Sequence, residues 1–87
     1  PAGFRVVSTE EEHLEDSGKR VVHILYSDGL ASVSAFIVAA DSEHAPRAAL
    51  LGTSNSYSVQ RDGYRITAMG QVPAATVERI AQSLTLR

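Results

Sequence analysis

Apolar and polar residues alternate along two stretches of this chain, and an Asp-Gly pair interrupts each stretch. The first pair is Asp28-Gly29 and the second is Asp62-Gly63. An Asp-Gly pair between strand-like runs predicts a β-hairpin, because glycine adopts the positive φ of a tight turn without steric cost. The sequence therefore predicts two hairpins, and these four residues define their turns.

The first hairpin is predicted between Arg20 and Ala40, with a two-residue loop that places Ser27 opposite Leu30. Side chains alternate between the faces of a strand, so this register assigns each residue to a face. One face is apolar apart from a phenol and is expected to form the core: Val22, Ile24, Tyr26, Ala31, Val33, Ala35 and Ile37. The other face is mixed: Val21, His23, Leu25, Leu30, Ser32, Ser34 and Phe36.

The second hairpin is predicted to place Arg61 opposite Tyr64 and Val59 opposite Ile66. Its apolar face comprises Tyr57, Val59, Tyr64, Ile66 and Ala68. Its polar face comprises Ser56, Ser58, Gln60, Arg65 and Thr67. Apolar and polar residues alternate more strictly here than in the first hairpin, which indicates that the second hairpin has one buried and one solvated side.

The segments before and between the hairpins predict a first strand and two loops. Residues 4–9 have the composition of a strand, whereas residues 10–19 and 41–46 have that of loops. Residues 47–52 fit either a helical turn or the start of a strand. We favour the strand, because helix-poor residues continue as far as Val59.

The C-terminal segment predicts a helix that starts near Pro73, because proline fixes a φ suitable for a first helical turn. Val77, Ile80, Ala81 and Leu84 form an apolar stripe at helical spacing. The apolar sheet face is the available partner for this stripe. The expected fold is therefore α+β, a small curved antiparallel sheet of about five strands packed on a C-terminal helix.

The length of 87 residues predicts one domain, residues 1–87. Because the chain starts at Pro1 rather than at methionine, we expect it to be part of a longer protein. The net charge of −2 gives no indication of nucleic-acid binding. The charge is uneven, since residues 1–44 contain eight acids and three bases, whereas residues 45–87 contain two acids and five arginines. This asymmetry is compatible with a polar partner.

Nothing in the sequence predicts catalysis, a cofactor or a metal site. The chain has no cysteine, and His13, His23 and His44 lack the spacing of zinc ligands. The acidic run at residues 10–16 lacks the pattern of a calcium loop. No Gly-x-Ser-x-Gly motif or phosphate-binding glycine loop is present.

The mixed face of the first hairpin departs from a solvated surface, because it contains Val21, Leu25, Leu30 and Phe36. If no other element covers these residues, they form a docking patch for another domain or chain. The alternative is a sheet that curls enough to bury both faces in part. The sequence favours neither, so these four residues are candidate partner-binding residues.

Several segments together resemble the C-terminal domain of the MucB/RseB family, and within it the Pseudomonas type. They are residues 26–34 with Phe36-Ile37, Asn55 and Tyr57, Asp62-Gly63-Tyr64, and the residues from Gly70 to Ala81 that include Val72-Pro73 and Ala75-Thr76-Val77. The spacing between these segments fits the family as well as the segments do. Residues 10–16 and 41–46 carry no part of the pattern.

The resemblance implies a periplasmic regulator of the envelope-stress response, including alginate biosynthesis. Such proteins bind the periplasmic part of a MucA/RseA-type anti-sigma factor and shield it from proteolysis, so that the sigma factor stays sequestered. Lipid or lipopolysaccharide is expected to release the regulator. The resemblance also implies a larger N-terminal domain similar to lipoprotein carriers, and it implies no catalytic residues.

Two other roles remain open. An acyl chain could lie between sheet and helix, where Ala31, Ala35 and Ala68 are small, which predicts a pocket of roughly several hundred Å³. The second role is that of a purely structural domain, which stabilises its neighbour. Exposed hairpin edges also favour self-association.

Overall fold

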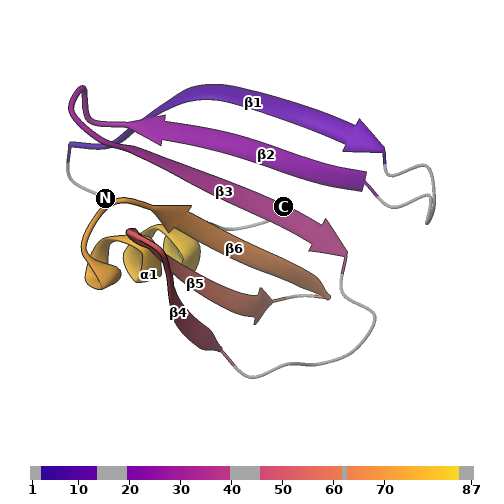
Figure 1. Cartoon of the computed structure of the whole chain (residues 1–87). Helices are drawn as coiled ribbons and strands as arrows, with labels where there is room; N and C mark the ends of the chain where they lie inside the picture. The colour runs from indigo at the N-terminus through magenta and orange to yellow at the C-terminus, as the bar shows by residue number, and fades with distance from the viewer. Residues whose placement is uncertain (1–2, 14–19, 40–45, 62, 85–87) are drawn as a thin grey trace.

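The computed structural model describes residues 3–13, 20–39, 46–61 and 63–84. These residues form one antiparallel sheet of six strands with a helix on one face (Figure 1). The elements in chain order are β1 (Arg5–His13), β2 (Arg20–Ser27), β3 (Ser32–Ala39), β4 (Arg47–Leu51), β5 (Ser54–Arg61), β6 (Tyr64–Gly70) and α1 (Ala74–Ser83). The order across the sheet is β1-β2-β3-β6-β5-β4, so β1 and β4 are its edges. The predicted α+β class is confirmed.

The sheet has six strands rather than about five, because the stretch from Arg47 to Arg61 folds back on itself. Leu51 lies opposite Ser54, and a two-residue turn joins them. Gly52 at φ 63° makes this turn possible. The preference for a strand at residues 47–51 is therefore confirmed, but the turn that ends it contains no Asp-Gly pair and was not predicted.

The first strand is longer than predicted, because β1 continues through Glu10, Glu11 and Glu12 to His13. The prediction of a loop from residue 10 was wrong. An edge strand tolerates charged side chains, since they reach solvent beside the unpaired edge. Glu11 also pairs with Arg20 of β2, with 2.6 Å between oxygen and nitrogen, and this pair raises the pKa of Arg20. Residues 14–19 and 41–45 of the predicted loops, and residue 40 at the end of the predicted hairpin, lie outside the described residues.

The register of the second hairpin is confirmed, whereas that of the first is wrong by two residues. Arg61 lies opposite Tyr64 as predicted, and Gly63 has φ 82°; Asp62 lies outside the described residues. In the first hairpin, however, Ser27 lies opposite Ser32 rather than Leu30. A shift of two residues leaves each strand residue on its predicted face.

The carboxylate of Asp28 explains the different register. Its Oδ1 accepts hydrogen bonds from the amides of Leu30 and Ala31 at 2.8 and 2.7 Å. These bonds close a four-residue loop, residues 28–31, in which Gly29 has φ 96°. They also lower the pKa of Asp28. Asp28 and Gly29 therefore define the turn, but the turn is wider than the predicted two-residue loop.

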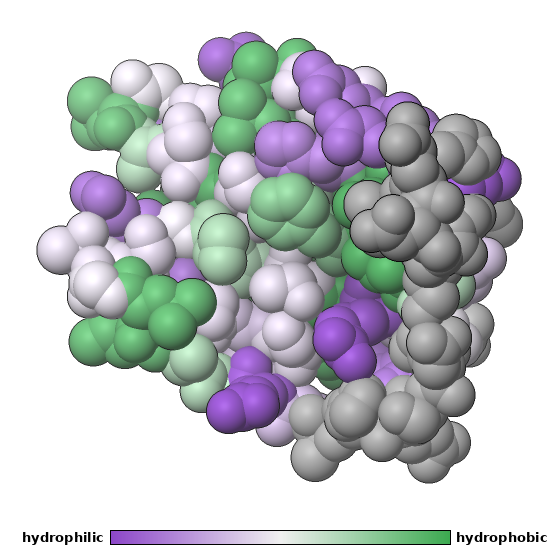
Figure 2. All heavy atoms as spheres, turned by 45° about the vertical axis from the view of Figure 1, so that its right-hand side comes forward, coloured by the Kyte–Doolittle hydropathy of each residue, from purple (hydrophilic) through white to green (hydrophobic). Residues whose placement is uncertain are grey.

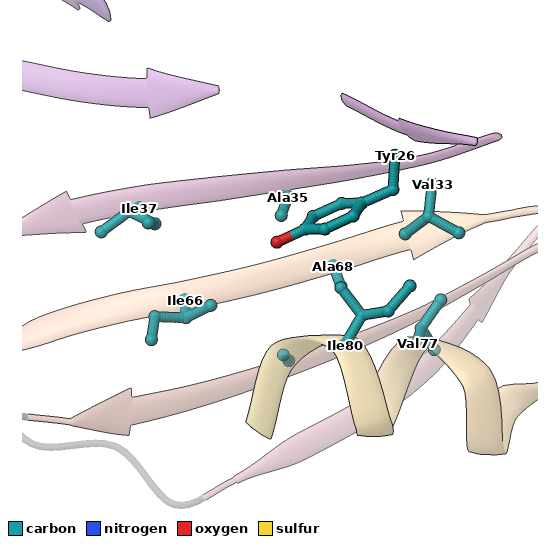
Figure 3. Packing of buried hydrophobic residues seen from close by; sticks show 9 residues of the cluster. Tyr26, Val33, Ala35, Ile37, Ile66, Ala68, Val77 and Ile80 are labelled. Atoms are coloured by element: carbon teal, nitrogen blue, oxygen red, sulfur yellow. The ribbon is translucent and has the colours of Figure 1, made fainter. Parts of the chain in front are cut away.

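The core lies between α1 and the sheet face predicted to be apolar (Figure 3). Its side chains are at most 7% exposed: Tyr26, Val33, Ala35, Ile37, Ile66, Ala68, Val77, Ile80 and Ala81. Val77 and Ile80 project from α1 toward Ala68 on the sheet. Burial raises the pKa of the Tyr26 phenol. The predicted helical stripe is confirmed for Val77, Ile80 and Ala81, which are buried. Leu84 also packs against the core, but it follows the last helical residue in extended backbone.

Side chains of β5 hold both ends of α1. The Asn55 side chain donates to the carbonyl of Val72, one residue before the N-cap Pro73, at 2.9 Å. At the other end, Arg61 donates to the carbonyls of Gln82 and Leu84 at 2.7 and 3.3 Å. Carbonyls at a helix C-terminus lack partners within the helix, so a cation there stabilises it. These bonds fix α1 on one face of the sheet, and no helix of the described residues lies on the opposite face.

Candidate functional site

The face of the sheet opposite α1, which we call the helix-free face, is the surface to which the predicted partner-binding residues belong. Among the described elements, none packs over it. It lies toward the viewer in Figure 1, with α1 behind the sheet, and Figure 2 shows it obliquely. Its members follow from the strand registers: Val21, His23, Leu25, Ser34, Phe36, Val38, Ser56, Ser58, Gln60, Arg65, Thr67 and Met69.

The structure brings Val21, Leu25 and Phe36 together in the middle of this face. Phe36 lies opposite His23, and Val21 and Leu25 flank His23 on the same strand. The rings of His23 and Phe36 stack with 4.7 Å between centroids and 7° between planes. Both rings are half-buried, as are Val21 and Leu25. Their apolar atoms therefore remain partly accessible, as a docking patch requires.

Leu30 occupies a different place from the one predicted. The wider turn puts it in the loop at residues 28–31 rather than on a strand, and its side chain is 98% exposed. The backbone amides of this loop donate hydrogen bonds to the side chains of Asp28 and Ser27, with the Gly29 amide 3.0 Å from Ser27 Oγ. Leu30 is thus an apolar side chain presented to solvent by a braced turn, separate from the Phe36 cluster.

Leu30 borders an open hollow of about 470 Å³ at the end of the sheet where β3 begins and β6 ends. The residues around the hollow are neutral, and several bring a hydroxyl or amide: Leu30, Ala31, Ser32, Ser34, Ser54, Met69, Gly70 and Gln71. Ser34 and Met69 lie opposite each other on β3 and β6, next to Leu25. Such a lining accommodates an apolar side chain and leaves hydroxyls for the backbone beside it.

Sequence reasoning missed Met69, whereas it placed Ser32 and Ser34 on the mixed face without naming them as binding residues. The predicted polar face of the second hairpin already contained Arg65 and Thr67, and the alternation places Met69 next on that face. The alternation along this strand therefore could have identified Met69 from the sequence. Ser54 joins the hollow because β5 pairs with β6, where Asn55 lies opposite Gly70 and brings Ser54 beside the end of β6.

Charges of opposite sign lie at opposite sides of the helix-free face. Glu10 and Glu12 of β1 lie opposite His23 and Val21 of β2. Across the sheet, Arg47 of β4 lies opposite Ser58, and Arg65 lies on β6. Arg5 of β1 also lies on this face, opposite Ser27, so the acids are confined to the part of β1 beside His23 and Val21. A partner that crosses the face from that part meets acids, an apolar centre and then arginines, and this order favours one orientation of a charged partner.

The described residues contain no group of three or more His, Cys, Asp or Glu side chains that could hold a metal ion. Of the three histidines, His13 and His23 lie on β1 and β2, and His44 lies outside the described residues. Within the described part of the chain, no helix is long and apolar enough to cross a membrane. Among the described residues, the helix-free face is the surface whose side chains are suited to binding.

The space between sheet and helix does not favour the acyl-chain alternative. Ala35 and Ala68, whose small size suggested room for a ligand, are fully buried against Val77 and Ile80. Figure 3 shows these side chains filling the region between α1 and the strands. The hollow beside Leu30 is lined by residues of the opposite face and of the loops at its end.

Known proteins are similar to this chain in sequence and in fold. The MucB/RseB C-terminal domain model matches residues 1–85. The chain is 34% identical to the sigma-E factor regulatory protein RseB of Salmonella typhimurium, covering 100% of this chain and 28% of that protein. It is 33% identical to the same-named protein of Haemophilus influenzae, covering 100% of this chain and 27% of that protein.

Two solved structures share the fold at 29% identity and 93% coverage of this chain. One is MucB in complex with MucA(peri), with a TM-score of 0.80 and 32% of that chain covered. The other is the Pseudomonas aeruginosa MucA/MucB complex, with a TM-score of 0.79 and 30% covered. These identities do not assign the chain to the Pseudomonas type. The chain spans less than a third of the length of the curated relatives that it matches. It belongs to the MucB/RseB C-terminal domain family.

Proposed function

We propose that this chain is the C-terminal domain of a periplasmic negative regulator of an envelope-stress sigma factor pathway. In this proposal it binds the periplasmic region of a MucA/RseA-type anti-sigma factor. The function named for the relatives supports the pathway, and the MucA complexes of the solved structures support the partner. The remainder of the protein is a larger N-terminal domain that shares the task of binding, as the length of the relatives suggests.

The observation that carries the proposal is a helix-free face with an apolar centre. A domain of this size can bury one face of its sheet under α1, and the other face then stays available. Phe36, Leu25 and Val21 are the kind of aromatic and aliphatic side chains that form the centre of protein interfaces. The hollow beside Leu30 adds a place for a partner side chain.

Binding on this face offers a physical route to protection from proteolysis. A protease acts on chain that is locally unfolded and accessible, and its rate follows the accessible fraction. An anti-sigma segment held against the helix-free face is not accessible. Regulation therefore requires no chemistry from this domain, and we propose that it acts without catalysis.

The experiment is isothermal titration of the chain with the periplasmic segment of MucA. We expect wild-type binding at about micromolar strength or better, and a loss of about tenfold or more for Leu25→Glu, because the substitution places a charge in the apolar centre. Circular dichroism should stay native. Val6→Glu is the matched control, because Val6 is 56% exposed and lies opposite Tyr26, on the other face.

Unchanged affinity of Leu25→Glu would exclude the helix-free face as the binding site. If the wild-type chain does not bind while the full-length protein does, the domain supports its neighbour structurally and does not itself recognise the partner.

A further inference from the structure

We propose that the edge of β4 binds an extended segment of the anti-sigma factor by strand addition. This inference rests on the proposed function and specifies how the partner is held. In strand addition, main-chain hydrogen bonds to a sheet edge supply affinity, and side chains on alternate sides supply specificity. Among the described strands the sheet is open, so β1 and β4 each have an edge that no other described strand pairs with.

The two edges differ in the features that prevent pairing with another strand. β1 has an irregularity between Val6 and Ser8, where its register with β2 shifts, and it carries Glu10, Glu11 and Glu12. Bulges and charges are the features by which proteins prevent edge strands from pairing. β4 has a regular register throughout its length. The features of β4 that oppose pairing with another strand are its short length and Arg47.

The side chains of β4 are those of a strand that receives a partner. Leu50 and Leu51 are 67% and 58% exposed, and consecutive strand residues face opposite sides of the sheet. An added strand would thus have an exposed leucine beside it on each face. Such a strand gains apolar contact in addition to its main-chain hydrogen bonds.

Charge favours a partner segment over a second copy of this chain. Residues 47–61 contain Arg47 and Arg61 and no acid, and Arg61 is engaged with the end of α1. If the β4 edges of two copies paired, two positively charged strands would lie side by side. Pairing with β1 of a second copy is opposed by the bulge and the carboxylates of β1. The segment that fits is extended, bears aliphatic side chains, and has an acidic residue near Arg47.

The β4 edge is continuous with the helix-free face. Leu51 lies opposite Ser54, which lines the hollow beside Leu30. An extended segment that leaves β4 at Gly52 therefore arrives at the hollow and then at the apolar centre. One partner segment can occupy the edge and the face together.

Amide hydrogen exchange of the chain with and without saturating MucA periplasmic segment tests this inference. We expect exchange to slow by about tenfold or more on binding at the alternate amides of residues 47–51 that point away from β5, because these amides become paired, with no such change in β1. The double variant Leu50→Ser/Leu51→Ser keeps the charge constant and should bind about tenfold more weakly. Val7→Ser is the matched control, since Val7 is 61% exposed on β1.

The possible results separate this inference from the proposed function. Wild-type binding without protection of residues 47–51, and with unchanged affinity of the double variant, overturns strand addition and leaves the proposed function standing. Protection that increases with protein concentration in the absence of the MucA segment assigns the edge to a second copy and also overturns it. Absence of any wild-type binding overturns both.

Discussion

Replacement of Ile80 by alanine is expected to lower the free energy of unfolding by about 2–5 kcal/mol, as for other fully buried isoleucines. Ile80 is 0% exposed and lies between α1 and the sheet, beside Val77 and Ala68 (Figure 3). The substitution removes apolar contacts and leaves a cavity that the sheet cannot fill without bending. Because a small domain has a total stability of about 5–15 kcal/mol, this is a large fraction.

Urea unfolding followed by circular dichroism measures this effect. Glu78→Ala is the matched control, because Glu78 lies on the same helix and is exposed. The control should change stability by no more than about 0.5 kcal/mol. A loss below about 1 kcal/mol for Ile80→Ala would show that α1 does not pack on the sheet as described.

Replacement of Gly70 by alanine is expected to cost about 3 kcal/mol, the upper part of the range for overpacking. A Cβ at this position would lie 2.6 Å from the carbonyl oxygen of Ser32 and 3.2 Å from Val33 Cγ2. Gly70 ends β6, which is paired on both sides, with Val33 on β3 and Asn55 on β5. The strand therefore has little room to move away from the contact.

Gly29→Ala is the comparison for this substitution. A Cβ on Gly29 meets nothing within 4 Å, so its cost comes from the positive φ alone, about 1–2 kcal/mol. Thermal or urea unfolding of both variants measures which substitution destabilises the protein more. A cost for Gly70→Ala that does not exceed that of Gly29→Ala would contradict the close approach of β3 and β6.

The sequence predicted the faces of the strands better than it predicted the turns. Hydrophobic alternation identified the core residues of β2, β3 and β6, because burial selects the side chain at every second position. It could not reveal that Asp28 would accept two amide hydrogen bonds and widen its turn by two residues. Asp28-Gly29 predicted a turn at the correct place but did not determine its length.

Edges were the other weakness of sequence reasoning. The glutamates from Glu10 to Glu12 have the composition of a loop, but an edge strand accommodates them because its outer side faces water. Gly52 and Thr53 make a turn without the Asp-Gly signal, so β4 was merged with β5. Both errors concern the two strands at the edges of the sheet, where burial constrains the sequence least.

The candidate site was predicted in part. Val21, Leu25 and Phe36 share a face because alternation within a hairpin is reliable, whereas Leu30 was assigned to that face only through the wrong register. The hollow needed tertiary information, since its lining comes from β3, β5, β6 and two connecting segments. No local pattern brings such distant residues together.

The central claim is that the helix-free face binds the anti-sigma factor, and Met69 allows the most direct test. It is the chain's only methionine, it lies on that face, and it borders the hollow. We would follow its isotope-labelled methyl signal by NMR while adding the MucA periplasmic segment. We expect the Met69 signal to shift and to saturate together with the heat of binding, while the methyl signals of buried Ile80 stay in place. Saturable heat with an unmoved Met69 signal would contradict it.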